Sequence, residues 1–479
     1  MGKFKDSSVH DLYNSDLSPV EEDEKEVKPI GYGFVWFGIA IQITCFMSLS
    51  PLVSYFTIGQ FILVLIIGST LIGILSLIAQ DLGLKYGISF ATSVSVAFGY
   101  RGGRITNMIR IFPSVIFIGL NAYIGAVALN ELFKMVFGFE SIILALVINI
   151  GILLPVTLNK IKGIEKFMFF IAPILFIVGI YMFYVVLTAY NVSFFDTFSM
   201  GNLQNESPSI SRWLFSVTVV IGVFSSVALG VNDFTRDCKN VSNNNKWFQS
   251  NRGYFIAALM GLVPSLAFLS TLGAITIALS GRTDALVVIS ELIQERSMIL
   301  AILLQLFIVL AQVSTNAVAN LLPSTYAILS LFPKKLSFKT SIVGLTILGF
   351  ILVPVGTGGY LDSILSICSA TAGPAMAIIG VDYYIIRKRN ISLDALYNSR
   401  GKYQYFKGVN IVAFSVYIIS TLIGFVFFSY LSFYVSTTLA AILYYLGYRM
   451  FNKKYPAMLT DENNYTTEAS ASCSNDVTL

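Results

Sequence analysis

Long apolar stretches recur along almost the whole of this 479-residue chain and restrict its possible folds more than any other feature. A helix rises 1.5 Å per residue, so about 20 apolar residues cross a hydrocarbon core about 30 Å thick. Backbone groups in that core cannot bond to water, and therefore only helices or closed barrels can span it. Because the stretches are continuous rather than alternating, they predict helices. We therefore expect a polytopic, all-α membrane protein.

Composition supports this expectation. Hydrophobic residues make up 56% of the chain and charged residues 12%, whereas soluble domains carry about 25% charged residues. Residues 1–29 are polar and acidic and contain no cleavable signal peptide, so the first span is expected to direct its own insertion. The cysteines are scattered and show no metal-ligand spacing.

We expect twelve transmembrane helices, at residues 32–55, 58–80, 105–134, 140–158, 165–190, 212–232, 252–280, 298–322, 338–356, 361–384, 408–428 and 430–450. If the N-terminus is cytoplasmic, most loop lysines and arginines fall on the inner side. The outer loops then hold only Lys134, Arg212, Arg282 and Arg296. This positive-inside bias predicts an even number of spans and cytoplasmic tails at both ends. The protein itself is expected in the cell membrane.

The middle of every expected span lacks Asp, Glu, Lys, Arg and His. Asp233, Asp362 and Asp382 fall at span ends, and the single histidine, His10, lies in the N-terminal tail. An intramembrane histidine base or a carboxylate proton relay is therefore hard to build. The absence of buried charge argues against an enzyme and favours a neutral solute.

Polar and aromatic residues do occur inside several spans. Span 8 contains Ser314, Thr315, Asn316 and Asn320, and the two asparagines, four apart, share one helix face. Other spans contribute Gln42, Phe117, Asn121 and Phe224. Taken singly, such residues more often serve helix packing or bond to their own helix. Together they could bind a flat ring through amides and aromatic faces, and a small cation through hydroxyls and carbonyls.

Four stretches in order carry a family resemblance, namely Trp36–Gln42, Gly99–Gly103, Ser314–Leu322 and Gly373–Tyr397. They resemble the nucleobase–cation symporter family, which includes cytosine/purine, uracil, thiamine, allantoin and hydantoin permeases, and most closely its bacterial hydantoin permeases. The resemblance implies a leucine-transporter-like fold, with a 5+5 inverted repeat and two added C-terminal helices. Its expected segments are a cytoplasmic tail (1–29), repeat 1 (30–190), repeat 2 (210–384), spans 11 and 12 (408–450) and a second cytoplasmic tail (451–479).

The resemblance also implies site residues. Gly38, Ile41, Ala311, Ser314 and Thr315 match the family's sodium ligands. The expected solute-binding residues are Phe117, Asn121, Phe224, Asn320 and Gln42, and Leu365 matches a gate over the site. Phe117 stands where the family has tryptophan, and Asn121 stands where it has the longer glutamine. These two departures leave the choice of ring open.

The expected function is uptake of a nucleobase or related neutral cyclic amide, coupled to sodium by alternating access. The alternative is a proton-coupled transporter of the same fold for another small solute, such as a vitamin ring or an amino acid. A non-transporting receptor with the same pocket also stays open. The expected partners are the solute, sodium and the lipid bilayer, with no cofactor, no nucleic acid and no obligate protein partner.

Overall fold

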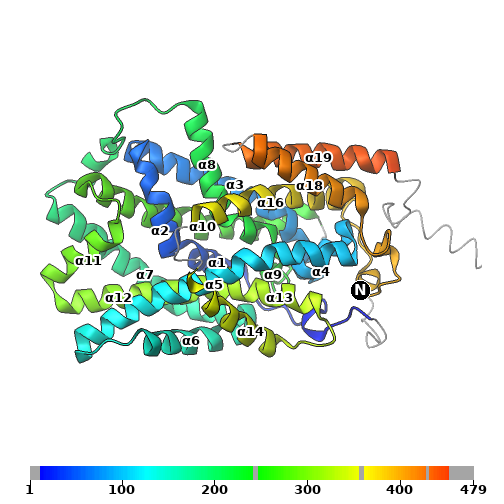
Figure 1. Cartoon of the computed structure of the whole chain (residues 1–479), viewed down its shortest axis with the longest axis horizontal. Coiled ribbons are helices and arrows are strands. Elements are labelled where there is room, and N and C mark those ends of the chain that lie inside the picture. The colour runs from blue at the N-terminus through cyan, green and yellow to red at the C-terminus, as the bar shows by residue number, and fades with distance from the viewer. Residues whose placement is uncertain (1–10, 241–245, 355–360, 428–430, 452–479) are drawn as a thin grey trace, which may run out of the picture.

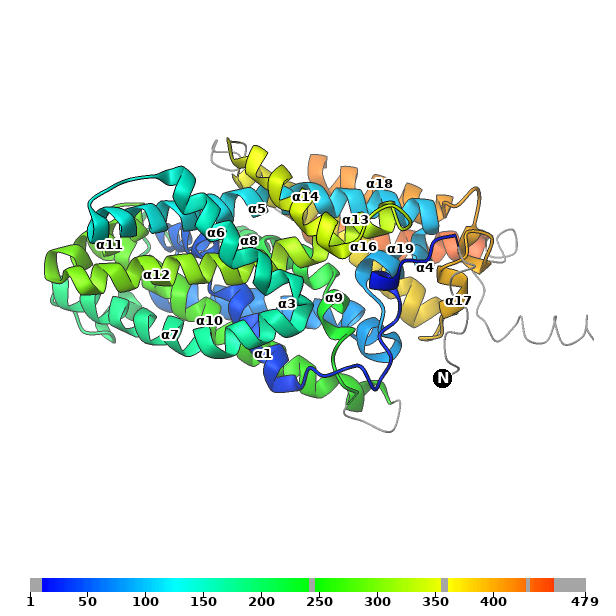
Figure 2. The same ribbon diagram turned by 90° about the horizontal axis from the view of Figure 1, so that it is seen from below.

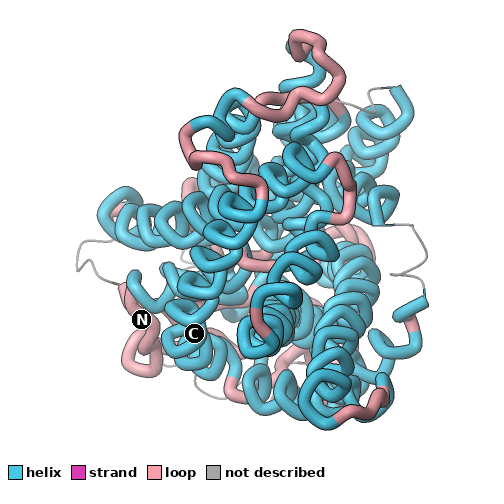
Figure 3. Tube along the Cα trace, turned by 90° about the vertical axis from the view of Figure 1, so that its left-hand side faces the viewer, coloured by secondary structure: helices cyan, strands magenta, loops and turns pink. Residues whose placement is uncertain are grey.

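The computed structural model describes residues 11–240, 246–354, 361–427 and 431–451, and this part of the chain is helical throughout, without a named strand (Figures 1 and 3). The α-helices are α1 Pro29–Ala40, α2 Ile43–Leu49, α3 Ile58–Tyr86, α4 Phe90–Phe98, α5 Tyr100–Phe137, α6 Ile142–Leu158, α7 Lys160–Ala189, α8 Ile210–Leu229, α9 Asn232–Thr235, α10 Trp247–Ser280, α11 Ala285–Arg296, α12 Met298–Thr315, α13 Leu322–Leu331, α14 Phe338–Ile351, α16 Leu361–Gly380, α17 Leu393–Leu396, α18 Ile411–Phe427 and α19 Ser432–Phe451.

Among the described residues, six helices are long and apolar enough to cross a membrane. The bent pair Pro29–Ala40 and Ile43–Ser54 makes a seventh if it is counted as one span. Every expected span coincides with helix, but several of these helices are shorter, including α6, α14 and α18. The all-helical class is therefore confirmed, and the total of twelve spans stays a prediction.

Helix ends follow local sequence signals. α3 begins with a capping box in which the Thr57 hydroxyl accepts from the Gln60 amide and the Gln60 side chain accepts from the Thr57 amide. It ends at Gly87, whose φ of +66° suits glycine. The helix thus runs past the expected end at residue 80 and includes Asp81. The sequence did not predict α4 and α11, which are too short to span a membrane.

The first expected span, 32–55, is not continuous. α1 ends at Ala40, α2 begins at Ile43, and the two helices differ in direction by 56°. Ile41 has a ψ of 81° and Gln42 a φ of −137°, so neither is helical. The Gln42 amide bonds to the Ala40 carbonyl instead of to Gly38, its partner in a regular helix. The Gly38 carbonyl is therefore released from its helix at the break.

Span 8 changes its winding where its polar residues lie. α12 ends at Thr315, a π-helical segment (η5) covers Asn316–Leu321, and α13 continues from Leu322. A second π-helical segment (η6), Val381–Ile386, follows α16. Such segments widen the backbone and often mark functional sites.

The helices pack in two groups. One group joins α1, α3, α8, α9 and α10, and the other joins α5 with α12, α13 and α14. α16 packs on α8 and on the C-terminal pair α18 and α19. Figure 2 shows α6, α7 and α12 running side by side. The site described below lies where the two groups meet.

The N-terminal segment packs on one end of the bundle, near α4 and α17 (Figure 2). There the Arg236 guanidinium donates to the Ser18 carbonyl at 2.6 Å, and the Leu12 amide donates to the Tyr397 carbonyl. Leu17 and Val27 are buried. Residues 11–28 are therefore an ordered strap, whereas their polar composition predicted only a tail. The expected C-terminal tail, from residue 452 onward, lies outside the described residues.

Candidate functional site

A small cavity of about 50 Å³ lies between the two helix groups. Its walls come from the α1–α2 break, α5, α8, η5 and α16. The lining residues are Ile39, Gln42, Thr44, Ser48, Pro113, Ser114, Phe117, Gly222, Val223, Phe224, Ser226, Val227, Ala319, Asn320 and Cys368. None of these side chains is charged, so the cavity suits a neutral solute.

Four of the five solute-binding residues expected from the sequence line this cavity. Gln42 comes from the break, Phe117 from α5, Phe224 from α8 and Asn320 from η5. The chain therefore brings two aromatic rings and two amides, from four separate segments, into one space. Aromatic faces suit a flat ring, and amides suit the donors and acceptors on its edge.

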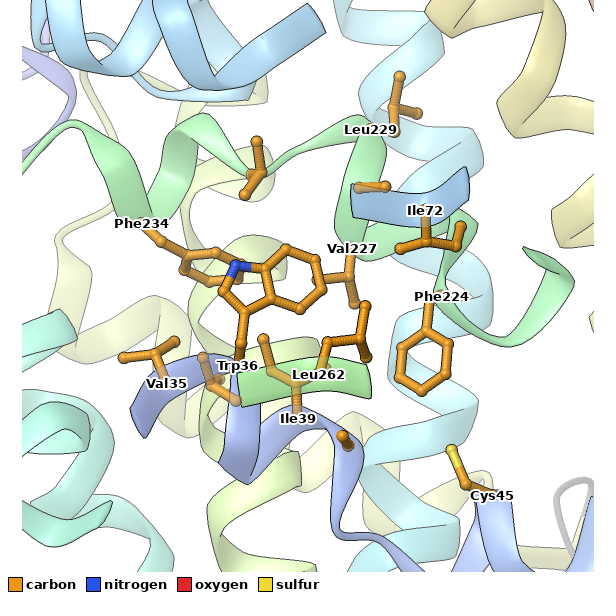
Figure 4. Close-up of a cluster of buried hydrophobic side chains, with 14 of the residues drawn as sticks. Val35, Trp36, Ile39, Cys45, Ile72, Phe224, Val227, Leu229, Phe234 and Leu262 are labelled. Carbon is orange, nitrogen blue, oxygen red and sulfur yellow. The ribbon is translucent and has the colours of Figure 1, made fainter. Parts of the chain in front are cut away.

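The aromatic and apolar wall continues into the core. Figure 4 shows Phe224 extending from α8 toward the side on which Cys45 lies, while Trp36 and Ile39 of α1 lie close to Val227. Phe224 is fully buried, and Phe117 is half-buried. The wall that carries Phe224 is therefore close-packed, which holds that side chain in place.

Gln42 is folded back onto α2. Its amide oxygen accepts from the Thr44 hydroxyl at 2.7 Å, and its amide nitrogen donates to the Cys45 sulfur at 2.8 Å. Gln42 is also the N-terminal cap position of α2. Gln42 therefore lies at the break and also forms part of the cavity wall.

Asn121 is the expected solute-binding residue that does not line the cavity. It lies one helical turn after Phe117, it is buried, and its Oδ1 accepts from Gln312 Nε2 at 3.1 Å. Asparagine is one methylene shorter than glutamine and reaches less far from α5. Gln312 lies in the expected span 298–322, but its role was missed; the available signal was an uncharged amide inside an apolar span.

The asparagines of η5 have different surroundings. Asn316 Nδ2 donates to the Ile118 carbonyl of α5 at 3.0 Å, so Asn316 joins two helices. Asn320 Nδ2 lies 3.5 Å from Asn316 Oδ1, and Asn320 also faces the cavity. Asn320 therefore keeps hydrogen-bonding capacity for a solute.

Two of the residues that match sodium ligands, Thr315 and Gly38, are in contact next to the α1–α2 break. Thr315 Oγ1 donates to the Gly38 carbonyl at 3.0 Å, and Ser314 Oγ donates to the Ala311 carbonyl at 2.8 Å. Ile41 is at the break itself, and all five residues are buried. Hydroxyl and carbonyl oxygens suit a hard cation. Within the described ranges, no group of three or more His, Cys, Asp or Glu residues could hold a metal ion.

The expected gate, Leu365, belongs to α16, but its side chain lies outside the described residues. Other lining residues were not singled out in the sequence, namely Thr44, Ser48, Ser114, Ser226 and Cys368. Small hydroxyl and thiol side chains are common in membrane helices, so sequence alone offered no signal to separate these from packing residues.

Charged residues approach the site from one side. Arg110 of α5 pairs with Asp233 of α9 at 2.8 Å, and both side chains are buried. Asp233 also accepts from the Phe90 amide at 2.8 Å, so the pair joins α4, α5 and α9. Arg110 lines a small adjacent cavity that shares Pro113, Ser226 and Cys368 with the central one.

The chain is similar to known permeases over most of its length. Residues 19–450 match the family model described as permease for cytosine/purines, uracil, thiamine, allantoin. The chain is 31% identical to a hydantoin permease of Microbacterium maritypicum over 86% of this chain and 84% of the relative. It is 25% identical to an allantoin permease of Bacillus subtilis, over 88% and 89% of the two chains.

The fold is also similar to solved structures of a transporter. The nucleobase-cation-symport-1 family transporter Mhp1, in a closed conformation with bromovinylhydantoin bound, superposes with a TM-score of 0.87 at 30% identity, over 93% of this chain and 97% of Mhp1. The inward-facing conformation of Mhp1 superposes with a TM-score of 0.82 at 30% identity, over 95% and 97% of the two chains. The helix arrangement described here is thus shared with a transporter, and it lies nearer to the closed form.

Proposed function

Since this chain belongs to the family of permeases for cytosine/purines, uracil, thiamine and allantoin, it is a membrane transporter, and we propose that it takes up a nucleobase or related neutral cyclic amide in symport with sodium. The observation that carries the proposal is the single cavity lined by Gln42, Phe117, Phe224 and Asn320 at the α1–α2 break. Purines, pyrimidines, allantoin and hydantoin all fit this chemistry.

In the proposed binding mode the solute ring stacks between Phe117 and Phe224. Asn320 and Gln42 offer donors and acceptors to the ring edge, and Asn121 takes part from the next turn of α5. The lining carries no charge, which supports a neutral ring over an amino acid. An amino acid would need partners for its carboxylate and ammonium groups in the same space.

Sodium is proposed to bind beside this cavity. Its oxygen ligands would come from Gly38, Ile41 and Ala311 in the main chain and from Ser314 and Thr315 in the side chains. Two features support this assignment, namely the Gly38 carbonyl released at the break and the Thr315 hydroxyl 3.0 Å from it. Sodium would hold α1 against α12 and thereby favour the state that binds solute.

The proposed topology has twelve spans with both tails in the cytoplasm, spans 1–5 and 6–10 forming inverted repeats. The positive loops support this orientation, because those expected inside meet the N-terminal strap. Lys160 pairs with Asp16, and Lys162 pairs with Glu26. Alternating access would then rock α1, α3, α8 and α10 against α5 and α12, with Leu365 of α16 as an outer gate.

Uptake into proteoliposomes tests the proposal. Labelled uracil, cytosine, hypoxanthine, allantoin and hydantoin are offered with an inward sodium gradient, or with choline in place of sodium. We expect saturable uptake of at least one ring in sodium and little uptake in choline. Equal uptake in both salts would refute sodium coupling. Uptake driven by a proton gradient alone would establish the proton-coupled alternative.

A further inference from the structure

Gln312 of α12 lies between the proposed sodium ligands Ala311 and Ser314, but its side chain contacts two other helices. Its Oε1 accepts from the Ile43 amide at 3.3 Å, and its Nε2 donates to Asn121 Oδ1 at 3.1 Å. Only 1% of its surface is exposed. Gln312 thus connects the first residue of α2, just after the break, with the expected solute-binding amide of α5.

The direction of both hydrogen bonds follows from the backbone. The Ile43 amide can only donate, so the atom of Gln312 that faces it must be the carbonyl oxygen. The amino group of Gln312 then faces Asn121, which must accept through Oδ1. A main-chain donor therefore fixes the orientation of two side-chain amides in succession.

This orientation leaves Asn121 with its amino group free. Asn121 Nδ2 is buried and has no hydrogen-bond partner among the described residues. A buried donor without an acceptor is unfavourable. Asn121 lies one helical turn from Phe117, which lines the cavity, so this unpaired donor is next to the wall on which a ring would stack.

We propose that Gln312 is a positioning residue that fixes Asn121 as a hydrogen-bond donor, so that the carrier selects rings with a carbonyl oxygen at that edge. The proposal rests on the proposed function and narrows it. A ring with an amino group at the same position would place that donor against the Asn121 amino group, which is also a donor, and no hydrogen bond would form. The solute class becomes the oxo forms of these rings rather than their amino forms.

Matched pairs of rings test the selection on the purified full-length protein in sodium. The pairs are uracil and cytosine, hypoxanthine and adenine, and hydantoin and glycocyamidine, each differing by an amino or imino group in place of a carbonyl. The measurement is the Kd of each ring, obtained from the rise of the unfolding temperature with ring concentration. We expect the carbonyl member of a bound pair to be favoured about tenfold or more, the usual effect of one hydrogen bond.

Three variants separate positioning from packing. Gln312→Met keeps the side-chain length but frees Asn121 to turn, so the ratio within a pair should fall toward one. Asn121→Asp keeps an acceptor for Gln312 and offers a carboxylate oxygen to the solute, so the preference should move toward the amino member. Gln305→Met, two turns earlier in α12 and also at a buried position, should keep the wild-type ratio.

Several outcomes would overturn the inference. They are a wild type without preference for the carbonyl member, an unchanged ratio in Gln312→Met, or the same loss in Gln305→Met. If Gln312→Met does not fold, Asn121→Asp decides the question, because a retained carbonyl preference contradicts the proposal. A wild type that is stabilised by none of the six rings and takes up none of the labelled rings, allantoin included, refutes the proposed function itself, and the inference with it.

Discussion

Thr315 carries the most direct contact between the proposed sodium ligands of the two helices. Its hydroxyl bonds to the Gly38 carbonyl, a group released by the break in the first span. We predict that Thr315→Ala raises the sodium concentration for half-maximal uptake by roughly tenfold, the effect of losing one oxygen contact to a charge. The order of preference among rings should not change.

Thr325→Ala is the matched control for this measurement. Thr325 is also buried in the same run of helix, but its hydroxyl bonds to the Leu321 carbonyl of its own helix. Sodium dependence should stay at the wild-type level in this variant. An equal shift in both variants would mean that Thr315 acts through helix packing and not through sodium.

Asn320 is predicted to act on the solute instead. Asn320→Ala removes an amide that faces the cavity, so ring affinity should fall roughly tenfold or more while the sodium requirement persists. Ring-dependent thermal stabilisation measures the first effect, and uptake at graded sodium measures the second. The control is Asn149→Ala, a buried asparagine of α6 outside the cavity lining. Unaltered ring affinity in Asn320→Ala would exclude Asn320 from the site.

The sequence predicted these residues better than it predicted their contacts. Phe117, Phe224, Gln42 and Asn320 do share one cavity. Asn121 is outside its lining, and its oxygen accepts from Gln312. A hydrogen bond between residues 191 positions apart leaves no trace in local pattern, so this relay could be found only in three dimensions.

At the scale of elements, helix crossings depend on small residues that sequence does not distinguish. A methyl group on Gly119 of α5 would overlap the Gly349 carbonyl oxygen of α14, whereas one on Gly151 of α6 meets nothing within 4 Å. We predict that Gly119→Ala destabilises the protein by about 1–3 kcal/mol. Gly151→Ala should be neutral or slightly stabilising, because alanine favours helix.

Thermal unfolding of the two purified variants checks this contrast. Gly119 lies between Phe117 and Asn121, so ring binding should weaken in Gly119→Ala as well. Equal stability of the two variants would mean that α5 and α14 are farther apart in the membrane than the structure places them.

The positions of the helices were readable from apolar stretches, but their irregularities were not. The break at Ile41 and Gln42 contains neither proline nor glycine, so the first span looks continuous. The π-helical turn at Asn316–Leu321 differs from α-helix by less than one residue per turn, and a short stretch cannot reveal such a difference. Tertiary hydrogen bonds decide both features.

At the scale of the whole molecule, composition sufficed for the all-helical class and the resemblance for the family, whereas the twelve spans and the inverted repeat stay predictions. The strap formed by residues 11–28 was missed, because polar composition does not distinguish a free tail from one tied down by main-chain bonds. Its contacts reach both helix groups, through Arg236 after α9 and through Pro333 after α13. The strap therefore supports the closed arrangement that the superposition also favours.

The Arg110–Asp233 pair is a further link between the two helix groups. It supports a prediction about the equilibrium between the open and closed states. α5 and α9 must separate if the cavity is to open on the side of the strap, and the buried pair opposes that movement. Asp233→Asn leaves the Arg110 charge without its counter-ion in a buried place, which strongly disfavours the closed state. Opening lets water reach Arg110, so the open state should gain population by about tenfold or more.

Cys368 reports this opening without an introduced cysteine, because it lines the central cavity and is buried in the closed state. Its alkylation by a maleimide supplied from the strap side, quantified by mass spectrometry, should be faster in Asp233→Asn than in the wild type. Glu291→Gln is the control, since Glu291 pairs with Arg282 at an exposed position and should leave the rate unchanged. An unaltered rate in Asp233→Asn would show that the pair stabilises open and closed states equally, and that the closed state is held by the strap and helix packing instead.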